Sequence, residues 1–291
     1  MKPLDSHLHL WDPRVLRYDW LNAVPALNSP QLPAQRAHAG DIPEAAIVVQ
    51  ADCAAEQALD EVMWINQLAE DSPFHLAGIV AWAPLEEGDA VVAHLRQLRA
   101  MPRVVGVRRS LQNEPDALFY DGHYRAGLLA AAREGFVLDL CVRAHQLPAV
   151  HHLLNWLYSQ HPDAKVVLDH MGKPGIIHNA WHEWQCAIET LAAFPALRCK
   201  ISGLPTEADW QHWSPAHIVP WIQHAVQVFG PRRCLFGSDW PVVNLAGGYA
   251  RWKQCVEMAI ADLCVADRQA IMAGNAREVY LSQSGEPFNH H

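Results

Sequence analysis

Near the N-terminus stands the segment Pro3-Leu4-Asp5-Ser6-His7-Leu8-His9-Leu10, a short apolar run that carries two histidines. Because side chains alternate sides along a β-strand, His7 and His9 point to one side and Leu8 and Leu10 to the other. Two imidazoles held side by side at the end of a strand form half of a metal site or of a proton-transfer site. The chain holds 18 histidines, so the pair taken alone is also compatible with ordinary core or surface histidines.

Similar apolar, β-branched runs recur along the whole chain. With the first one they make eight predicted strands: Leu4–Leu10, Ala46–Gln50, Leu76–Trp82, Val104–Arg108, Phe136–Val142, Lys165–Asp169, Leu197–Ile201 and Cys234–Gly237. Stretches with helical spacing lie between most of them: Glu56–Glu70, Ala90–Arg99, Tyr124–Arg133, Leu147–Ser159, Trp181–Ala193 and Pro215–Phe229. Alternation of this kind indicates βα units and a parallel sheet.

Eight βα units within 291 residues predict an α/β fold of the (β/α)₈ TIM barrel type, with a doubly wound open sheet as the alternative. Neither a GxGxxG nor a GxxxxGK[ST] motif is present, which disfavours the nucleotide-binding versions of the open sheet. We expect one domain over residues 1–291, closed by helices at Tyr249–Ile260 and Val265–Ala273. The proline-containing stretch Arg14–Asp41 interrupts the alternation of predicted strands and helices. It is interpreted as a long loop after the first strand, either a lid or an irregular surface excursion.

The composition of the chain favours some classes of protein and argues against others. Hydrophobic residues make up 51% and charged residues 18% of the chain, as in a compact enzyme with a large core. The net charge of -9 without a Lys/Arg cluster argues against nucleic-acid binding. No apolar run reaches the ~18 residues of a membrane span, and no signal peptide is evident. The seven cysteines include no CxxC, which predicts free thiols and a cytoplasmic location. A homo-oligomer is compatible with these features.

Polar residues gather where the predicted strands end, which in a TIM barrel is the face that carries chemistry. Besides the two histidines, these strand ends are Val107-Arg108-Arg109-Ser110, Leu168-Asp169-His170-Met171-Gly172-Lys173-Pro174, Lys200-Ile201-Ser202-Gly203 and Phe236-Gly237-Ser238-Asp239-Trp240-Pro241. Random placement would not often produce this pattern five times. The sequence therefore predicts one site built from several strand ends.

Three of these segments, His7-Leu8-His9, Leu168-Asp169-His170 and Gly237-Ser238-Asp239-Trp240-Pro241, resemble the amidohydrolase superfamily. The chain is more closely similar to its lactonase branch, which contains sugar lactonases and 2-pyrone-4,6-dicarboxylate lactonase. Supporting segments occur in the same order nearly end to end: Trp11-Asp12-Pro13, Tyr18-Asp19-Trp20-Leu21, Gly106 to Pro115, Asp169 to Pro174, Lys200 to Leu204 and Gly274-Asn275-Ala276.

The resemblance implies roles for individual residues. Asp239 would activate water or carry its proton, and His170 would stand beside it with the two N-terminal histidines. Lactone hydrolysis needs a nucleophilic water, a stabilised carbonyl oxygen and a proton for the leaving oxygen. Arg108 would supply permanent donors to the carbonyl or a carboxylate. Strand alternation turns only one of Arg108 and Arg109 inward, and we favour Arg108; Arg109 would then pair with an acid outside the barrel.

Further substrate-binding candidates are Arg109, Lys173, Trp11 and Trp240. For Lys173 the alternative is a role in shaping its loop, and for the tryptophans it is core packing, since the chain has 12 of them.

The resemblance also raises the question of a metal. His7, His9, His170 and Asp239 would hold one divalent ion, of which Zn²⁺ is the best candidate, or the enzyme would need none. A binuclear site is not expected, because the fifth predicted strand ends with Arg143 where a histidine would be needed. His145, just beyond that strand, is a substitute of uncertain register.

We therefore expect an enzyme, a hydrolase that opens a small carbohydrate-derived lactone of the L-fucono-, L-rhamnono- or galactono-lactone type. A neutral sugar lactone is favoured because few cationic side chains stand at the strand ends. The alternatives are a 2-pyrone-4,6-dicarboxylate lactonase, a metal-dependent decarboxylase of the same superfamily, and a barrel kept only as a binding scaffold.

Overall fold

The computed structural model describes residues 2–282. The expectation of one domain over residues 1–291 extends across Met1 and residues 283–291, which lie outside the described residues.

Eight parallel strands form one sheet in the order of the sequence. They are β1 (Leu4–Leu8), β2 (Ala45–Val49), β3 (His75–Ala81), β4 (Val104–Val107), β5 (Val137–Leu140), β6 (Val166–Leu168), β7 (Leu197–Ile201) and β8 (Cys234–Phe236). A bridge between Leu8 and Trp240, just beyond β8, joins the last strand to the first. This sequential order confirms the (β/α)₈ barrel. It excludes the doubly wound alternative, because the order of strands in such a sheet reverses at one point.

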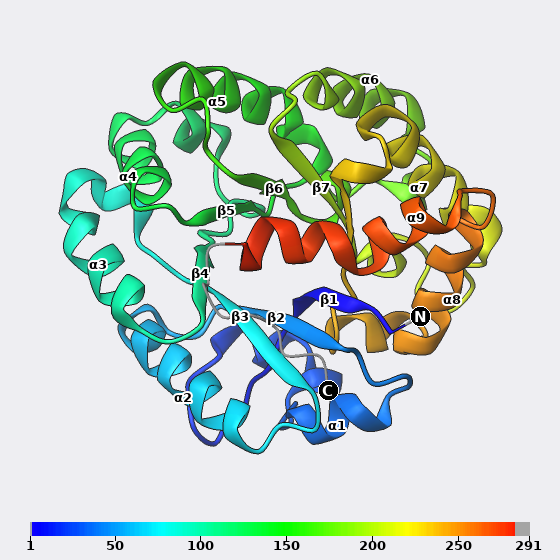
Figure 1. Cartoon of the computed structure of the whole chain (residues 1–291), viewed down its shortest axis with the longest axis horizontal. Coiled ribbons are helices and arrows are strands. Elements are labelled where there is room, and N and C mark those ends of the chain that lie inside the picture. The colour runs from blue at the N-terminus through cyan, green and yellow to red at the C-terminus, as the bar shows by residue number, and fades with distance from the viewer. Residues whose placement is uncertain (1, 283–291) are drawn as a thin grey trace.

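The helices surround the strands (Figure 1). They are α1 (Pro33–His38), α2 (Ala58–Glu70), α3 (Val92–Ala100), α4 (Gly122–Arg133), α5 (Leu147–Gln160), α6 (Trp181–Ala192), α7 (Pro215–Phe229), α8 (Gly248–Ala259) and α9 (Val265–Gln269). The predicted helices agree with these to within a few residues. The predicted strand Leu197–Ile201 coincides with β7, and the other seven run one or two residues past the observed ends, because pairing stops where the chain turns into the loops that carry polar residues.

Side chains alternate between the two faces of the sheet as the apolar runs predict. In β2, Ala45, Ile47 and Val49 pack inside the barrel, whereas Ala46 and Val48 pack against the helices. A strand buried on both faces favours apolar residues at successive positions, which explains runs such as that of β2. In β1 the pairing register shifts between Asp5 and Leu8.

The C-terminal segment closes one end of the barrel. After α9 the chain continues in π-helical turns at Ala270–Gly274 and Arg277–Leu281, and this segment crosses the middle of the ring of strands in Figure 1. Its apolar side chains, among them Val279 and Tyr280, pack on inward residues such as Val137 and Val167. The C-terminal segment, residues 265–281, is therefore a plug for the end of the barrel where the strands begin.

The stretch Arg14–Asp41 is ordered around a small core of its own. It contains α1 and two short 3₁₀ turns, and Leu16, Tyr18 and Leu21 pack with Trp11 and Leu27. The stretch connects β1 to β2 as the expected long loop, but it is not an irregular excursion, because these apolar side chains bury one another. No helix within residues 2–282 is long and apolar enough to cross a membrane. The seven cysteines are free, and Cys186 and Cys264 are exposed.

Candidate active site

The closure of the barrel brings the residues that follow β8 next to those at the end of β1. The backbone N–H of Asp239 donates to the carbonyl of His7 (2.8 Å), and that of His9 donates to the carbonyl of Trp240 (2.8 Å). Asp239 has a positive φ of 56°, a conformation that is costly for a residue with a side chain and is common at functional sites. The hydrogen bonds that close the barrel thus also fix the backbone on which three candidate residues stand.

The imidazoles of His7 and His9 point to the same side of β1, as strand alternation predicts. Their Nε2 atoms are 3.1 Å apart, and Asp239 Oδ1 lies 3.5 Å from Nε2 of His9 and 3.9 Å from Nε2 of His7. The Nδ1 atom of His9 is 2.8 Å from the carbonyl of Val49. Since a carbonyl only accepts, Nδ1 of His9 carries a proton, and in the neutral ring its Nε2 lone pair faces Asp239.

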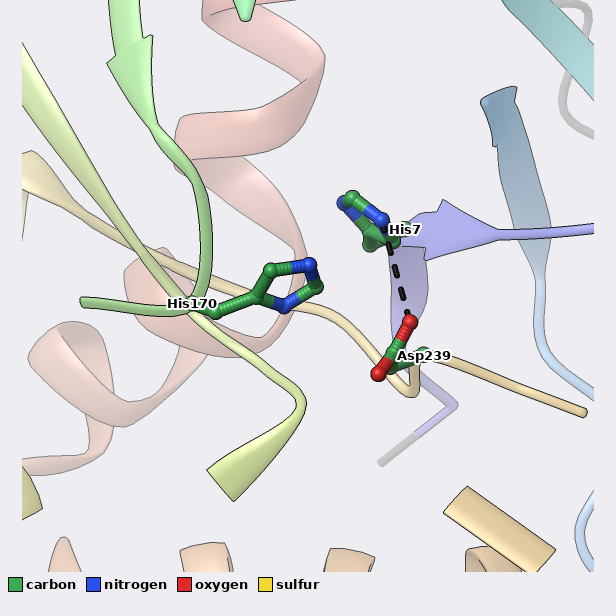
Figure 2. Close-up of side chains that lie close together, drawn as sticks. All are labelled: His7, His170 and Asp239. Atoms are coloured by element: carbon green, nitrogen blue, oxygen red, sulfur yellow. Dashed lines mark ion pairs between the residues drawn. The ribbon is translucent and has the colours of Figure 1, made fainter. Parts of the chain in front are cut away.

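His170 approaches the same carboxylate from the end of β6. Figure 2 shows His7, His170 and Asp239 converging from three different strand ends. The rings of His7 and His170 have centroids 4.5 Å apart, and the hydroxyl of Ser202 lies 2.9 Å from His170 Nδ1. His170 has a positive φ of 53°, so its side chain is aimed by an unusual backbone turn.

Gly203 makes room for this approach. A Cβ atom at this position would lie 2.6 Å from Nδ1 of His170 and 2.9 Å from Oδ2 of Asp239, and its φ is +66°. Both the contact and the backbone conformation therefore require glycine.

Burial sets the charge state of the site. Burial lowers the pKa of His170 to about 4, and burial likewise holds the pKa of His7 well below its usual range. For Asp239 burial acts to raise the pKa, but the neighbouring imidazoles, His170 first, outweigh it and leave the pKa below its usual range. At neutral pH the site thus contains the ionised carboxylate of Asp239 beside the neutral imidazoles of His7 and His170, a donor set that suits a divalent cation.

The two arginines that follow β4 lie on opposite sides of the barrel wall. Arg108 is 5% exposed; its guanidinium donates to the carbonyl of Gln50 (2.7 Å) and lies 3.4 Å from His7 Nε2. Arg109 instead pairs with Glu86 (2.9 Å) and Glu114 (2.8 Å). The structure therefore brings Arg108 to the histidines and places Arg109 away from them, with its guanidinium occupied by acids.

The candidate tryptophans are not brought to the site as open ring faces. Trp11 is fully buried, and its indole N–H donates to the carbonyls of Leu27 and Ser29. Trp240 is 1% exposed. Both lie in packed apolar clusters. Their positions therefore do not support the prediction that they bind substrate, and they agree with the alternative of core packing.

A cavity of about 790 Å³ lies over the loops that follow β5, β6 and β7. Its lining includes Arg143, His145, Lys173, Glu207 and Trp210. Lys173 Nζ is 3.8 Å from Glu207 Oε1, so the predicted binding residue Lys173 does line a pocket. His145 lines this cavity and does not join the imidazole cluster.

The lining of this cavity includes neither Asp239 nor the histidines of the site, and Glu207 is its link to them. Burial raises the pKa of Glu207, and the negative charge of Asp239 adds to that effect, which places the two carboxylates within electrostatic reach of each other. Trp210 is 46% exposed, so the cavity has an accessible aromatic face.

Three charged residues beneath the histidines were not assigned a role from the sequence. Lys200 Nζ donates to Asp139 Oδ2 (2.6 Å) and lies 2.9 Å from Asp169 Oδ1. All three side chains are fully buried. The available signal was a charged residue within an apolar run, Leu138-Asp139-Leu140 and Cys199-Lys200-Ile201, because such a residue must face the barrel interior and needs a partner there.

Several groups of acceptors in the barrel are close enough to hold a metal ion. In the first group, His7, His170 and Asp239 offer ligand atoms within 4.8 Å of one another, and all three are buried. A second group, His7 with Asp139 and Asp169, already surrounds the ammonium of Lys200. The first group is therefore the better candidate for a cation.

Comparisons with known proteins agree with this geometry. The sequence model of the amidohydrolase family matches residues 4–281. The chain is 33% identical to L-fucono-1,5-lactonase from Burkholderia multivorans, over 95% of each protein, and 22% identical to L-rhamnono-gamma-lactonase from Scheffersomyces stipitis, over 74% of this chain and 69% of that protein. A crystal structure of an amidohydrolase from Burkholderia multivorans with bound zinc superimposes with a TM-score of 0.83 at 32% identity, covering 96% of this chain and 99% of that one. The chain belongs to the amidohydrolase family.

Proposed function

We propose that this chain is a lactonase that opens a small, neutral, carbohydrate-derived lactone by attack of water on the acyl carbon. The observation that carries the proposal is the ionised Asp239 carboxylate, which stands at the strand ends beside the neutral imidazoles of His7 and His170. A cavity lies over the neighbouring loops that follow β5, β6 and β7. The L-fucono- and L-rhamnono-lactonase names of the relatives point to the same substrate class.

Asp239 takes the proton of the attacking water and returns it to the ring oxygen as the ester bond breaks. Proton transfer by a positioned group contributes about 10²–10⁴-fold to the rate. Arg108 supplies the permanent positive charge that stabilises the carbonyl oxygen as it becomes an oxyanion. Its neighbours Gln50 and Asp169 hold the guanidinium in place.

A divalent cation, with zinc as the best candidate, fits the donor set of His7, His9, His170 and Asp239. Acceptor atoms of His9 and Asp239 face each other at 3.5 Å, an arrangement that a shared cation stabilises. Such an ion makes bound water more acidic, which suits a carboxylate whose low pKa makes it a weak base towards free water. His7 would then turn its Nδ1 proton to Asp169 Oδ1, 3.4 Å away.

The cavity suits a polyhydroxylated ring. Its volume of about 790 Å³ lies in the range of small-molecule sites. Trp210 offers an apolar face for the C–H side of a sugar ring, and the Lys173–Glu207 pair offers both donors and acceptors to hydroxyl groups. The lining carries three acidic side chains against Lys173 and Arg143, so it offers no excess of positive charge to a dicarboxylate substrate.

The test is a pH-indicator assay of hydrolysis on a panel of sugar 1,4- and 1,5-lactones together with 2-pyrone-4,6-dicarboxylate. The protein is assayed as purified, after chelation and after chelation followed by zinc. We expect turnover of one sugar series, and a loss of about 10²–10⁴-fold in the Asp239→Asn variant with its thermal unfolding unchanged. Activity lost on chelation and restored by zinc supports the metal; activity that survives chelation rejects it. Turnover of the dicarboxylate alone, or of no lactone, refutes the proposal and leads to decarboxylation assays.

A further inference from the structure

A chain of buried polar groups connects the C-terminal plug to His7. The hydroxyl of Tyr280 donates to Asp139 Oδ1 (2.6 Å), and Asp139 Oδ2 accepts from Lys200 Nζ (2.6 Å). Lys200 Nζ lies 3.3 Å from His7 Nδ1 and 2.9 Å from Asp169 Oδ1. None of these residues is more than 3% exposed. One continuous path therefore runs through the barrel interior, from the end where the strands begin to the end that carries the site.

We propose that Tyr280 is a positioning residue, which acts on the active site by fixing Asp139 and, through it, the ammonium group of Lys200 against His7. The proposal rests on the assignment of His7 to the active site of the proposed lactonase. Tyr280 and His7 come from opposite ends of the chain, and the plug inserts the hydroxyl of Tyr280 against Asp139.

The hydrogen bond from Tyr280 completes the coordination of Asp139. One carboxylate oxygen accepts from Tyr280 and the other from Lys200, so the carboxylate cannot rotate without breaking a short, buried bond. Hydrogen bonds of this kind are stronger in a dry interior than in water. Burial, together with the charge of Asp139, raises the pKa of Tyr280 well above its usual range, so Tyr280 donates a proton without adding a charge.

The position of Lys200 matters because His7 Nδ1 lies between a donor and an acceptor. It is 3.3 Å from Lys200 Nζ and 3.4 Å from Asp169 Oδ1. An ammonium group can only donate and a carboxylate can only accept. The distance of Lys200 from this nitrogen therefore determines which ring nitrogen of His7 keeps its proton, and so which one presents a lone pair to the site.

The test is the Tyr280→Phe variant of the full chain. We expect kcat to fall about 10–100-fold, as for other outer partners of catalytic imidazoles, with KM within about twofold, since Tyr280 touches no substrate. Long-range ¹H–¹⁵N spectra of histidine-labelled protein should show the ring nitrogens of His7 shifted. The His7→Gln variant assigns those signals. The matched control is Tyr124→Phe, because the Tyr124 hydroxyl is buried and has no hydrogen-bond partner within residues 2–282; it should change neither measurement.

A double-mutant cycle tests the path itself. If Tyr280 acts through Asp139, the effect of Tyr280→Phe on kcat should largely disappear in an Asp139→Asn background. Equal effects in both backgrounds, or unchanged His7 signals in Tyr280→Phe, overturn the proposal. The spectra need no turnover, so they judge it even if the wild type hydrolyses no lactone, a result that would refute only the proposed function. They also judge it if Asp139→Asn does not fold.

Discussion

Replacing Gly203 by alanine tests whether the contact between His170 and Asp239 is what the site requires. The added Cβ atom would lie 2.6 Å from His170 Nδ1 and 2.9 Å from Asp239 Oδ2. At least one of the two side chains must move, because both are buried and neither contact is tolerable. The change adds one methyl group and removes no polar atom.

Two separable costs follow from the structure. The backbone of Gly203 has a φ of +66°, and an alanine there costs about 1–2 kcal/mol of stability. The displacement is about 0.5–0.8 Å from an ordinary van der Waals contact, and a misplacement of about 1 Å at catalytic groups lowers activity by about 10²-fold. We therefore expect kcat/KM to fall by about that factor.

Gly230 provides the matched control, since its φ is +76° and a Cβ atom there would meet nothing within 4 Å. The ψ of Gly230 is 149°, a region that is essentially restricted to glycine, so Gly230→Ala should lose about 1–3 kcal/mol in urea unfolding, while its kcat/KM for the best lactone stays unchanged. Gly203→Ala should lose activity as well as stability. If the two variants hydrolyse the lactone equally well, the contact at Gly203 does not position the catalytic groups, and the argument fails.

Other substitutions test the site and the pocket. Arg108→Met should lower kcat by about 10²–10³-fold, as does removal of an oxyanion donor, while Arg109→Met should leave kcat unchanged; equal losses would contradict the assignment of Arg108. Trp210→Ala should raise KM for a sugar lactone about 2–10-fold with little effect on kcat, and an unchanged KM would remove it from the binding site. Burial lowers the pKa of His170 from 6.5 to about 4, so in chelated protein the unfolded chain binds more protons between these values and stability rises with pH across that window. The free energy of unfolding of the wild type minus that of His170→Asn should therefore fall by about 3 kcal/mol from pH 7 to pH 4; a flat difference would contradict the shift.

The fold could be predicted from the sequence because every strand is buried on both faces. A parallel strand such as Ala45–Val49 is apolar at each position because both of its faces are buried. Such a run can be recognised in the sequence without knowing which strands lie beside it. The stretch Arg14–Asp41 was harder, since its elements are only three to six residues long. Short elements of this kind are stabilised by packing against one another, through Trp11 and Leu21 among others, and no periodicity shows that packing in advance.

The site was predicted to the extent that it follows from strand alternation. Alternation alone places His7 beside His9 and separates Arg108 from Arg109. Alternation does not predict which aromatic side chains of the loops are exposed. The candidates Trp11 and Trp240 are buried, whereas Trp210, which the sequence did not single out, lines the cavity. Alternation also says nothing of Tyr280, which enters the barrel from a segment that belongs to none of the eight strands.

The charged residues inside the barrel can be used to distinguish interactions that stabilise the fold from those that serve the chemistry. Lys200 and Arg108 are balanced by Asp139 and Asp169, with which they form buried ion pairs. Apolar layers fill the interior of a TIM barrel equally well, and replacing a buried ion pair by packed apolar residues is often neutral or stabilising. The stability of the fold therefore does not explain why these four charged residues occupy the barrel interior. Asp239 adds one further negative charge, and the buried imidazoles of His7 and His170 beside it are uncharged at neutral pH. The site is therefore built to accept a positive charge, either with a bound cation or as a proton taken from water.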